Sequence, residues 1–86
     1  MISAAKLKYL TNINADEITE LLLDAGYEGR DEPIINTHFD GAMVGTENLY
    51  FSYQASYVHV DGGLQFANIV VTYDINHGTI SADFAS

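Results

Sequence analysis

Hydrophobic and polar positions follow two different periods along the chain, and the change between them falls near residue 30. In the first third, Ile18, Leu21, Leu22 and Ala25 are spaced i, i+3, i+4, i+7, which places them on one face of a helix. Further along, apolar residues alternate with polar ones, as is typical of strands. The pattern predicts one domain, residues 1–86, with a helical part over 1–30 and a β-sheet part over 34–86.

Two helices are expected in the helical part, near residues 3–10 and 15–25. Ser3 is a candidate N-cap for the first helix. Asn14 is a stronger N-cap for the second, because Glu17 follows three residues later in the arrangement of a capping box. The two helices are expected to form an αα hairpin.

Four strands are expected in the β-sheet part, because runs of β-branched and aromatic residues are separated by turn residues. Asp40–Gly41 is a tight-turn pair that is expected to end the first strand. Short turns between consecutive strands imply an antiparallel meander, and a helical hairpin packed on one face of it gives an α+β domain of order ααββββ. The expected strands cover residues 34–39, 48–60, 64–73 and 79–84.

Aromatic residues at strand spacing are expected to fill much of the core, with Tyr50 and Tyr73 on the opposite face of the sheet. Strands of this kind that carry no Lys or Arg are prone to pairing edge to edge. A homodimer is therefore expected as one way to cap an edge. The aromatic residues assigned to the core are Phe51, Tyr53, Tyr57, Phe66 and Phe84.

Charge is the unusual property of this 86-residue chain, in which twelve acidic residues outnumber three basic ones for a net charge of −9. The basic residues Lys6, Lys8 and Arg30 all lie in the first thirty positions, and residues 31–86 contain seven acids and no Lys or Arg. Such a surface repels nucleic acid and anionic lipid and suits a basic partner. The absence of cysteine excludes a disulfide scaffold, a thiolate metal site and a cysteine nucleophile.

No segment predicts export or membrane insertion. The longest uninterrupted apolar runs, such as residues 69–71, have three residues, whereas a membrane-spanning helix needs about 20. A soluble protein of the cytoplasm is expected.

Acidic residues on the second predicted helix form the main candidate site. Asp16 and Glu17 are explained by the helix dipole, which favours anions in the first turn. Glu20 and Asp24 are not, because like charges four residues apart repel each other by about 0.2–0.5 kcal/mol. One interpretation is a solvated face that keeps the protein soluble. The other is a negative strip that binds Lys and Arg of another protein, since carboxylates about 5–6 Å apart on a helix approximate the spacing of successive phosphates.

The full set of candidate partner-binding residues extends beyond that helix. It comprises Asp16, Glu17, Glu20, Asp24, Asp31 and Glu32, with Asp61 and Asp74 as a secondary patch.

Histidine and aspartate occur two residues apart at His38/Asp40 and at His59/Asp61, and these side chains are suitable ligands for zinc or iron. Each pair ends at a predicted turn, where Asp is expected for turn formation alone. A metal site would need two such pairs to converge. No cofactor and no metal site is therefore expected. The protein is not expected to be an enzyme, because nothing in the sequence suggests a nucleophile or an oxyanion hole.

In size, acidity and lack of a motif, the whole chain resembles phage-encoded anti-CRISPR and anti-restriction proteins, several of which mimic nucleic acid. The resemblance implies a host CRISPR or restriction nuclease complex as partner, no catalysis and no cofactor. No direct contact with nucleic acid is expected, because a sheet without basic residues cannot hold phosphates. The acidic surface would compete for Lys and Arg that otherwise hold DNA or RNA. The alternative is a structural, self-assembling protein of a phage or mobile element, with an aromatic sheet face as its interface. A third hypothesis is a metal-dependent enzyme or metal sensor built on the His/Asp pairs.

Overall fold

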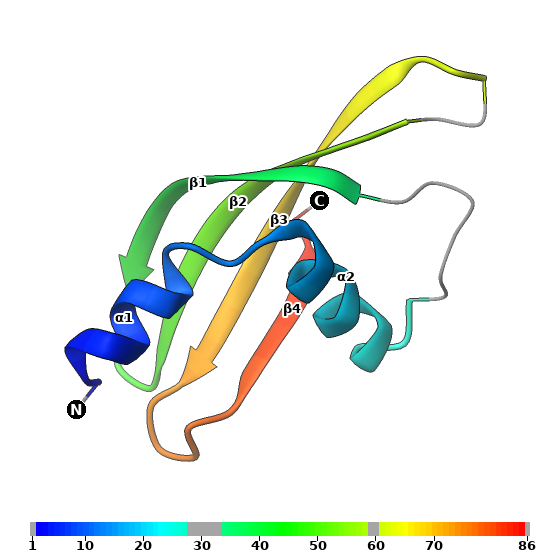
Figure 1. The fold of residues 1–86 in the computed structure, drawn as a ribbon. Helices are drawn as coiled ribbons and strands as arrows, with labels where there is room; N and C mark the ends of the chain where they lie inside the picture. The colour runs from blue at the N-terminus through cyan, green and yellow to red at the C-terminus, as the bar shows by residue number, and fades with distance from the viewer. Residues whose placement is uncertain (1, 28–33, 59–60, 86) are drawn as a thin grey trace.

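The computed structural model describes residues 2–27, 34–58 and 61–85 of the chain. Its strands form a single antiparallel sheet in the order β1-β2-β3-β4, and the two helices precede them in the sequence (Figure 1). The sequence-based prediction of an α+β fold with a β-meander is confirmed. The elements are α1 (Ala4–Leu10), α2 (Ala15–Asp24), β1 (Ile34–Val44), β2 (Asn48–Val58), β3 (Leu64–Asp74) and β4 (Ile80–Phe84).

Both helices begin at the residues that the sequence predicts. The Ser3 hydroxyl accepts a hydrogen bond from the Lys6 N–H at 3.1 Å, and the Asn14 side chain accepts one from the Glu17 N–H at 2.9 Å. Each bond satisfies a backbone donor of the first turn that has no partner within the helix. The second half of the expected capping box is replaced, because the Glu17 carboxylate accepts a hydrogen bond from Tyr9.

The helices lie on the same side of the sheet, and α2 packs against β4 and β1 (Figure 1). We call this side of the sheet the helix-facing side. Alternate residues of the two central strands point toward the helices, and the apolar face of α2 meets them, as its spacing requires. The buried cluster consists of Leu10, Ile13, Ile18, Leu22, Phe51, Tyr53, Ala55, Ile69, Val71, Tyr73 and Ala82.

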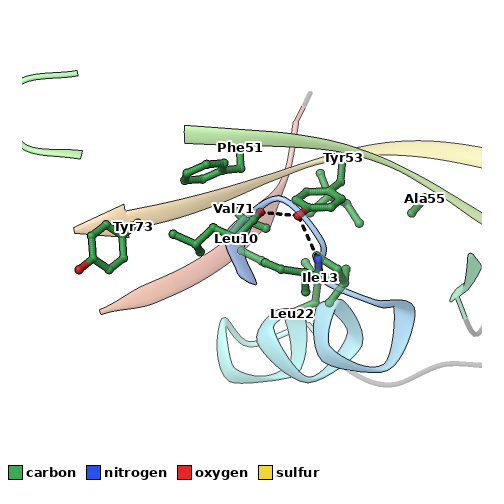
Figure 2. Packing of buried hydrophobic residues seen from close by; sticks show 11 residues of the cluster. Leu10, Ile13, Leu22, Phe51, Tyr53, Ala55, Val71 and Tyr73 are labelled. Atoms are coloured by element: carbon green, nitrogen blue, oxygen red, sulfur yellow. Dashed lines mark hydrogen bonds between the residues drawn. The ribbon is translucent and has the colours of Figure 1, made fainter. Parts of the chain in front are cut away.

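Tyr53 fixes the connection between the helices to the middle of the sheet (Figure 2). Its hydroxyl donates to the carbonyl oxygen of Leu10 and accepts from the N–H of Ile13 at 3.1 Å. Thr37 on β1 adds a third bond, since its hydroxyl donates to the Ile13 carbonyl at 2.9 Å. Because Tyr53 is 2% exposed, these bonds satisfy backbone groups that water does not reach.

The prediction of a turn at Asp40–Gly41 is wrong. β1 continues through this pair to Val44, and its register with β2 shifts between Phe39 and Gly41, which marks a β-bulge. The turn falls at residues 45–47, where the Gly45 N–H donates to the Asn48 carbonyl at 2.9 Å. An Asp-Gly pair is compatible with a bulge as well as with a turn. Here it forms a bulge, because β1 pairs with β2 both before and after it.

Three aromatic assignments are also wrong. Phe66 and Phe84 are predicted in the core but are 59% and 43% exposed, and Tyr73 is predicted on the opposite face but is buried. Phe84 lies on the edge strand β4, which has a neighbouring strand on one side only. Tyr57, also predicted in the core, is half-buried and lies outside the buried cluster.

The register pairs Tyr73 with Leu49 and Phe66 with Ser56, so Tyr73 faces the helices and Phe66 points away from them. The apolar run at residues 69–71 conceals which positions of β3 face inward, because it is apolar on both faces.

The molecule is elongated, with extents of 44 × 23 × 22 Å. β4 has five residues and pairs with the second half of β3, from Ile69 to Tyr73. The β2–β3 hairpin therefore extends past the helices and past β4 (Figure 1). Within the described residues, neither helix has the length and apolar character needed to cross a membrane.

Candidate functional site

The outer face of α2 carries three carboxylates in line, Asp16, Glu20 and Asp24, which we call the acidic row. They are spaced four residues apart and all three are exposed, so their side chains follow one another along the helix surface over about 12 Å. Among the described residues, none of the three forms an ion pair or accepts a side-chain hydrogen bond. The row is therefore a negative surface without a counter-charge from that part of the chain.

The core dictates which way the acidic row points. Ile18 and Leu22 of α2 are 0% and 6% exposed and are held against the sheet. Burial of two such side chains contributes about 1.5–3 kcal/mol each, which far exceeds the repulsion between neighbouring carboxylates. The opposite face of the helix, with the acidic row, is turned to solvent as a result.

Glu17 differs from the acidic row, although it was predicted to belong to the same site. Its carboxylate accepts a hydrogen bond from the Tyr9 hydroxyl at 2.5 Å, which connects α2 to α1. This hydrogen bond, together with burial and the negative charge of Glu17, raises the pKa of Tyr9 to about 12. Glu17 thus has a structural role between the helices.

The acidic row ends at an unfavourable position. Asp24 is the last residue of α2, where the exposed carbonyl groups give the helix end a partial negative charge. Beside it lies Leu23, an apolar side chain that is 45% exposed. This end of the helix therefore combines an unpaired carboxylate with an exposed apolar group.

Asp83 on β4 is a further exposed carboxylate, which no pattern in the sequence indicates. The Tyr27 hydroxyl, three residues beyond α2, donates to the Asp83 carboxylate, and this bond raises the pKa of Tyr27. Tyr27 also packs edge-on against the Phe84 ring, with centroids 4.9 Å apart. No local signal could have revealed Asp83, because 56 residues separate it from its partner.

The secondary patch is not one surface in this structure. Asp74 ends β3 and Asp61 precedes that strand, so they lie at opposite ends of eleven residues that span about 36 Å. Asp74 is engaged in its own turn, where its carboxylate accepts from the backbone N–H groups of Asn76 and His77 at 2.9 and 3.1 Å. The His77 ring, 3.0 Å away, and these N–H groups lower the pKa of Asp74. Asp31 and Glu32 lie outside the described residues.

The histidines do not form a metal centre in the part of the chain that the structure describes. No three His, Asp or Glu side chains come close enough there to bind a metal ion together. His59 lies outside the described residues. Asp40 falls in the β-bulge that displaces it from the regular alternation with His38.

A groove of about 830 Å³ lies between the α1–α2 connection and β1. Two of its polar groups, the hydroxyls of Tyr53 and Thr37, are hydrogen-bonded to backbone atoms of the same connection. The ionisable residues that line it are Asp16, His38 and Tyr53. These contacts stabilise the fold, and the arrangement pairs no nucleophile with a base. The lining residues are 11–16, 34–39 and 53.

Comparison with protein-family models, with curated proteins and with solved structures found no match for this chain. The site is therefore defined by its own geometry, as an acidic helix face on a small α+β domain.

Proposed function

We propose that this protein is a small acidic inhibitor that binds a basic, nucleic-acid-binding surface of a larger complex through the outer face of α2. The observation that supports this is the acidic row of Asp16, Glu20 and Asp24, which is exposed and lacks a counter-charge among the described residues. Like charges at i, i+4 and an acid at the helix C-terminus both destabilise α2. A cationic partner would relieve both costs.

The proposed mechanism is competition. Three negative charges over about 12 Å of helix offer Lys and Arg side chains the contacts that a nucleic-acid backbone would otherwise make. The net charge of −9 speeds the encounter with a cationic surface, and salt screens this attraction. The exposed Leu23 adds an apolar contact beside Asp24 that nucleic acid itself does not provide.

The resemblance in size and acidity to phage-encoded anti-CRISPR and anti-restriction proteins makes a host CRISPR or restriction nuclease complex the first partner to test. On this proposal the protein acts in the host cytoplasm, without catalysis and without a cofactor.

The test is affinity capture from a host lysate at low and high salt, with the wild type and a charge-reversed variant, Glu20→Lys/Asp24→Lys, as baits. The variant is expected to lose binding by about thirtyfold or more, because two charge contacts become repulsive at about 2–5 kcal/mol in total. The captured complex is expected to wash off at high salt and to be displaced by DNA or RNA. Far-UV circular dichroism of the variant should match the wild type, since both positions are exposed.

A second variant with the same change in net charge serves as the control. Asp40→Lys/Glu47→Lys alters two exposed acids on β1 and in the turn that follows it. It is expected to bind like the wild type. Equal capture by the Glu20→Lys/Asp24→Lys variant, or equal loss with both variants, would contradict a role for the α2 face.

A further inference from the structure

The sheet has a second side, which points away from both helices (Figure 1). The register places twelve residues of the two central strands on it, and none of them is buried. Asn48 and Asp74 form the last pair at one end, where Asp74 is bound in its own turn. We call the other ten residues the open face. It consists of Tyr50, Ser52, Gln54, Ser56 and Val58 on β2 and of Leu64, Phe66, Asn68, Val70 and Thr72 on β3.

The open face contains no charged residue, although the chain carries twelve acids and three bases. Carboxylates border it at two places. Asp74 lies at the end of β3, two residues beyond Thr72, and Asp83 of β4 lies opposite Val70 and is hydrogen-bonded to Tyr27. The ionisable His38 of β1 lies opposite Gln54. An exposed strand surface in a protein of net charge −9 would ordinarily carry some of that charge. A partner whose own contact surface is charged would find no counter-charge on the open face.

The side chains of the open face are chemically self-complementary. Hydroxyl and amide groups each contain both a donor and an acceptor, so the same surface can satisfy itself when two copies meet. The apolar members are gathered toward the end of the hairpin, where Val58 lies directly opposite Leu64 and Phe66 follows on the same side of β3. These three side chains are 40%, 55% and 59% exposed, which is a large apolar exposure for a chain of this size.

We propose that the open face binds a second copy of this chain, with the two sheets packed face to face. Of the surfaces described, this one brings two chains of like net charge together with least repulsion, because the acidic row of each copy lies on the outer side of its own sheet. With the flanking strands β1 and β4 as its rim, where His38 and Asp83 lie, a contact eleven residues long and up to four strands across gives about 500–700 Å² per copy, or roughly 1,000–1,400 Å² in total. That area lies at the lower end of the range for specific interfaces, so the dimer is expected to be reversible.

The proposal rests on the open face alone and is independent of the proposed inhibitor function. Its test is sedimentation of the wild type and of Gln54→Glu over the micromolar to millimolar range. The substitution is nearly isosteric and adds one charge to the middle of the open face. It is expected to raise the dimer dissociation constant by about a hundredfold or more, because each copy would bring an unpaired charge into the contact.

The chain offers a matched control in Gln65→Glu. Gln65 is exposed on the same β2–β3 hairpin, but it pairs with Tyr57 and lies on the helix-facing side. It is expected to leave the dissociation constant unchanged. Ser52→Glu places a charge at a neighbouring exposed position and is expected to dissociate the dimer as Gln54→Glu does.

Three outcomes would overturn the proposal. The first is a wild type that stays monomeric over the whole concentration range. The second is a dimer that responds equally to Gln54→Glu and to Gln65→Glu. The third is a dimer that resists the open-face variants but is dissociated by Ile35→Lys, because Ile35 is 56% exposed on the edge strand β1 and a charge there would block pairing between edges.

Discussion

Removal of the Tyr53 hydroxyl tests the connection between the helices and the sheet. Tyr53→Phe keeps the ring, which packs in the core at 2% exposure, and deletes one oxygen atom. The deleted oxygen is the partner of two backbone groups, the N–H of Ile13 and the carbonyl oxygen of Leu10. Ile13 and Leu10 are 2% and 0% exposed, so water does not replace the hydroxyl without rearrangement of the chain.

The expected loss follows from those two groups. A buried polar group left without a partner costs about 1–3 kcal/mol, so two of them cost about 2–4 kcal/mol when the connection relaxes in part. The free energy of unfolding of a chain of this length is about 4–13 kcal/mol. Tyr53→Phe is therefore expected to remove a large fraction of the stability without any change in the core volume occupied by the ring.

Urea unfolding followed by circular dichroism measures this loss. With a slope of about 1–3 kcal/mol per M, the midpoint is expected to fall by roughly 1–3 M urea at unchanged slope. Tyr57→Phe is the matched control, because Tyr57 lies on the same side of β2 and its hydroxyl has no hydrogen bond among the described residues. Equal midpoints for the two variants would refute the reasoning.

Two further predictions concern the helices. Asn14→Ala is expected to lower the free energy of unfolding by about 1 kcal/mol, whereas Asn14→Ser, which keeps a cap, should cost little; equal losses in urea unfolding would contradict the capping role. The pKa of Tyr9 is about 12 in the folded protein against 10.0 ordinarily. Protonated Tyr9 therefore contributes to the free energy of unfolding, and this contribution is fully present below pH 10 and is lost as the pH rises from 10 to 12. Glu17→Gln should return the Tyr9 pKa toward 10, seen in the absorption of tyrosinate, and Glu20→Gln should not; an unchanged titration in Glu17→Gln would exclude the assigned cause.

The two proposals fit together in one geometry. In a dimer formed through the open faces, the two sheets pack face to face and the acidic rows of both copies point outward. Such a dimer would present two negative helices to two basic sites, and simultaneous binding would raise the overall affinity without any new contact. The open-face variant Gln54→Glu separates the proposals, because it should reduce binding to a two-site partner while leaving single-site binding intact.

Local patterns in the sequence determined where the helices begin and how β2 is oriented. Ser3 and Asn14 cap the helices as predicted, since an N-cap acts on N–H groups within three residues of itself. The acidic row was predictable for the same reason, because residues four apart share a helix face in any context. The alternation of β2 likewise placed Phe51 and Tyr53 correctly in the core.

Tertiary structure alone decided features that depend on distant partners. Whether Asp40–Gly41 makes a turn or a bulge depends on how much of β1 finds a partner in β2, and Asp-Gly is compatible with both. The side of the sheet that Phe66 faces depends on register, because a shift of one residue exchanges the two faces of a strand.

The candidate site also combines features set by neighbouring residues with features set by distant ones. The acidic row was predictable from residues four apart, but the bond between Tyr27 and Asp83 spans 56 residues, and the separation of Asp61 from Asp74 follows from the straight run of β3 between them. A short-range pattern fixes backbone conformation through bonds within one or two turns. Contacts between distant segments depend on which of several compatible strand pairings buries the most apolar surface. That burial depends on the whole tertiary structure, so no local pattern in the sequence reveals it.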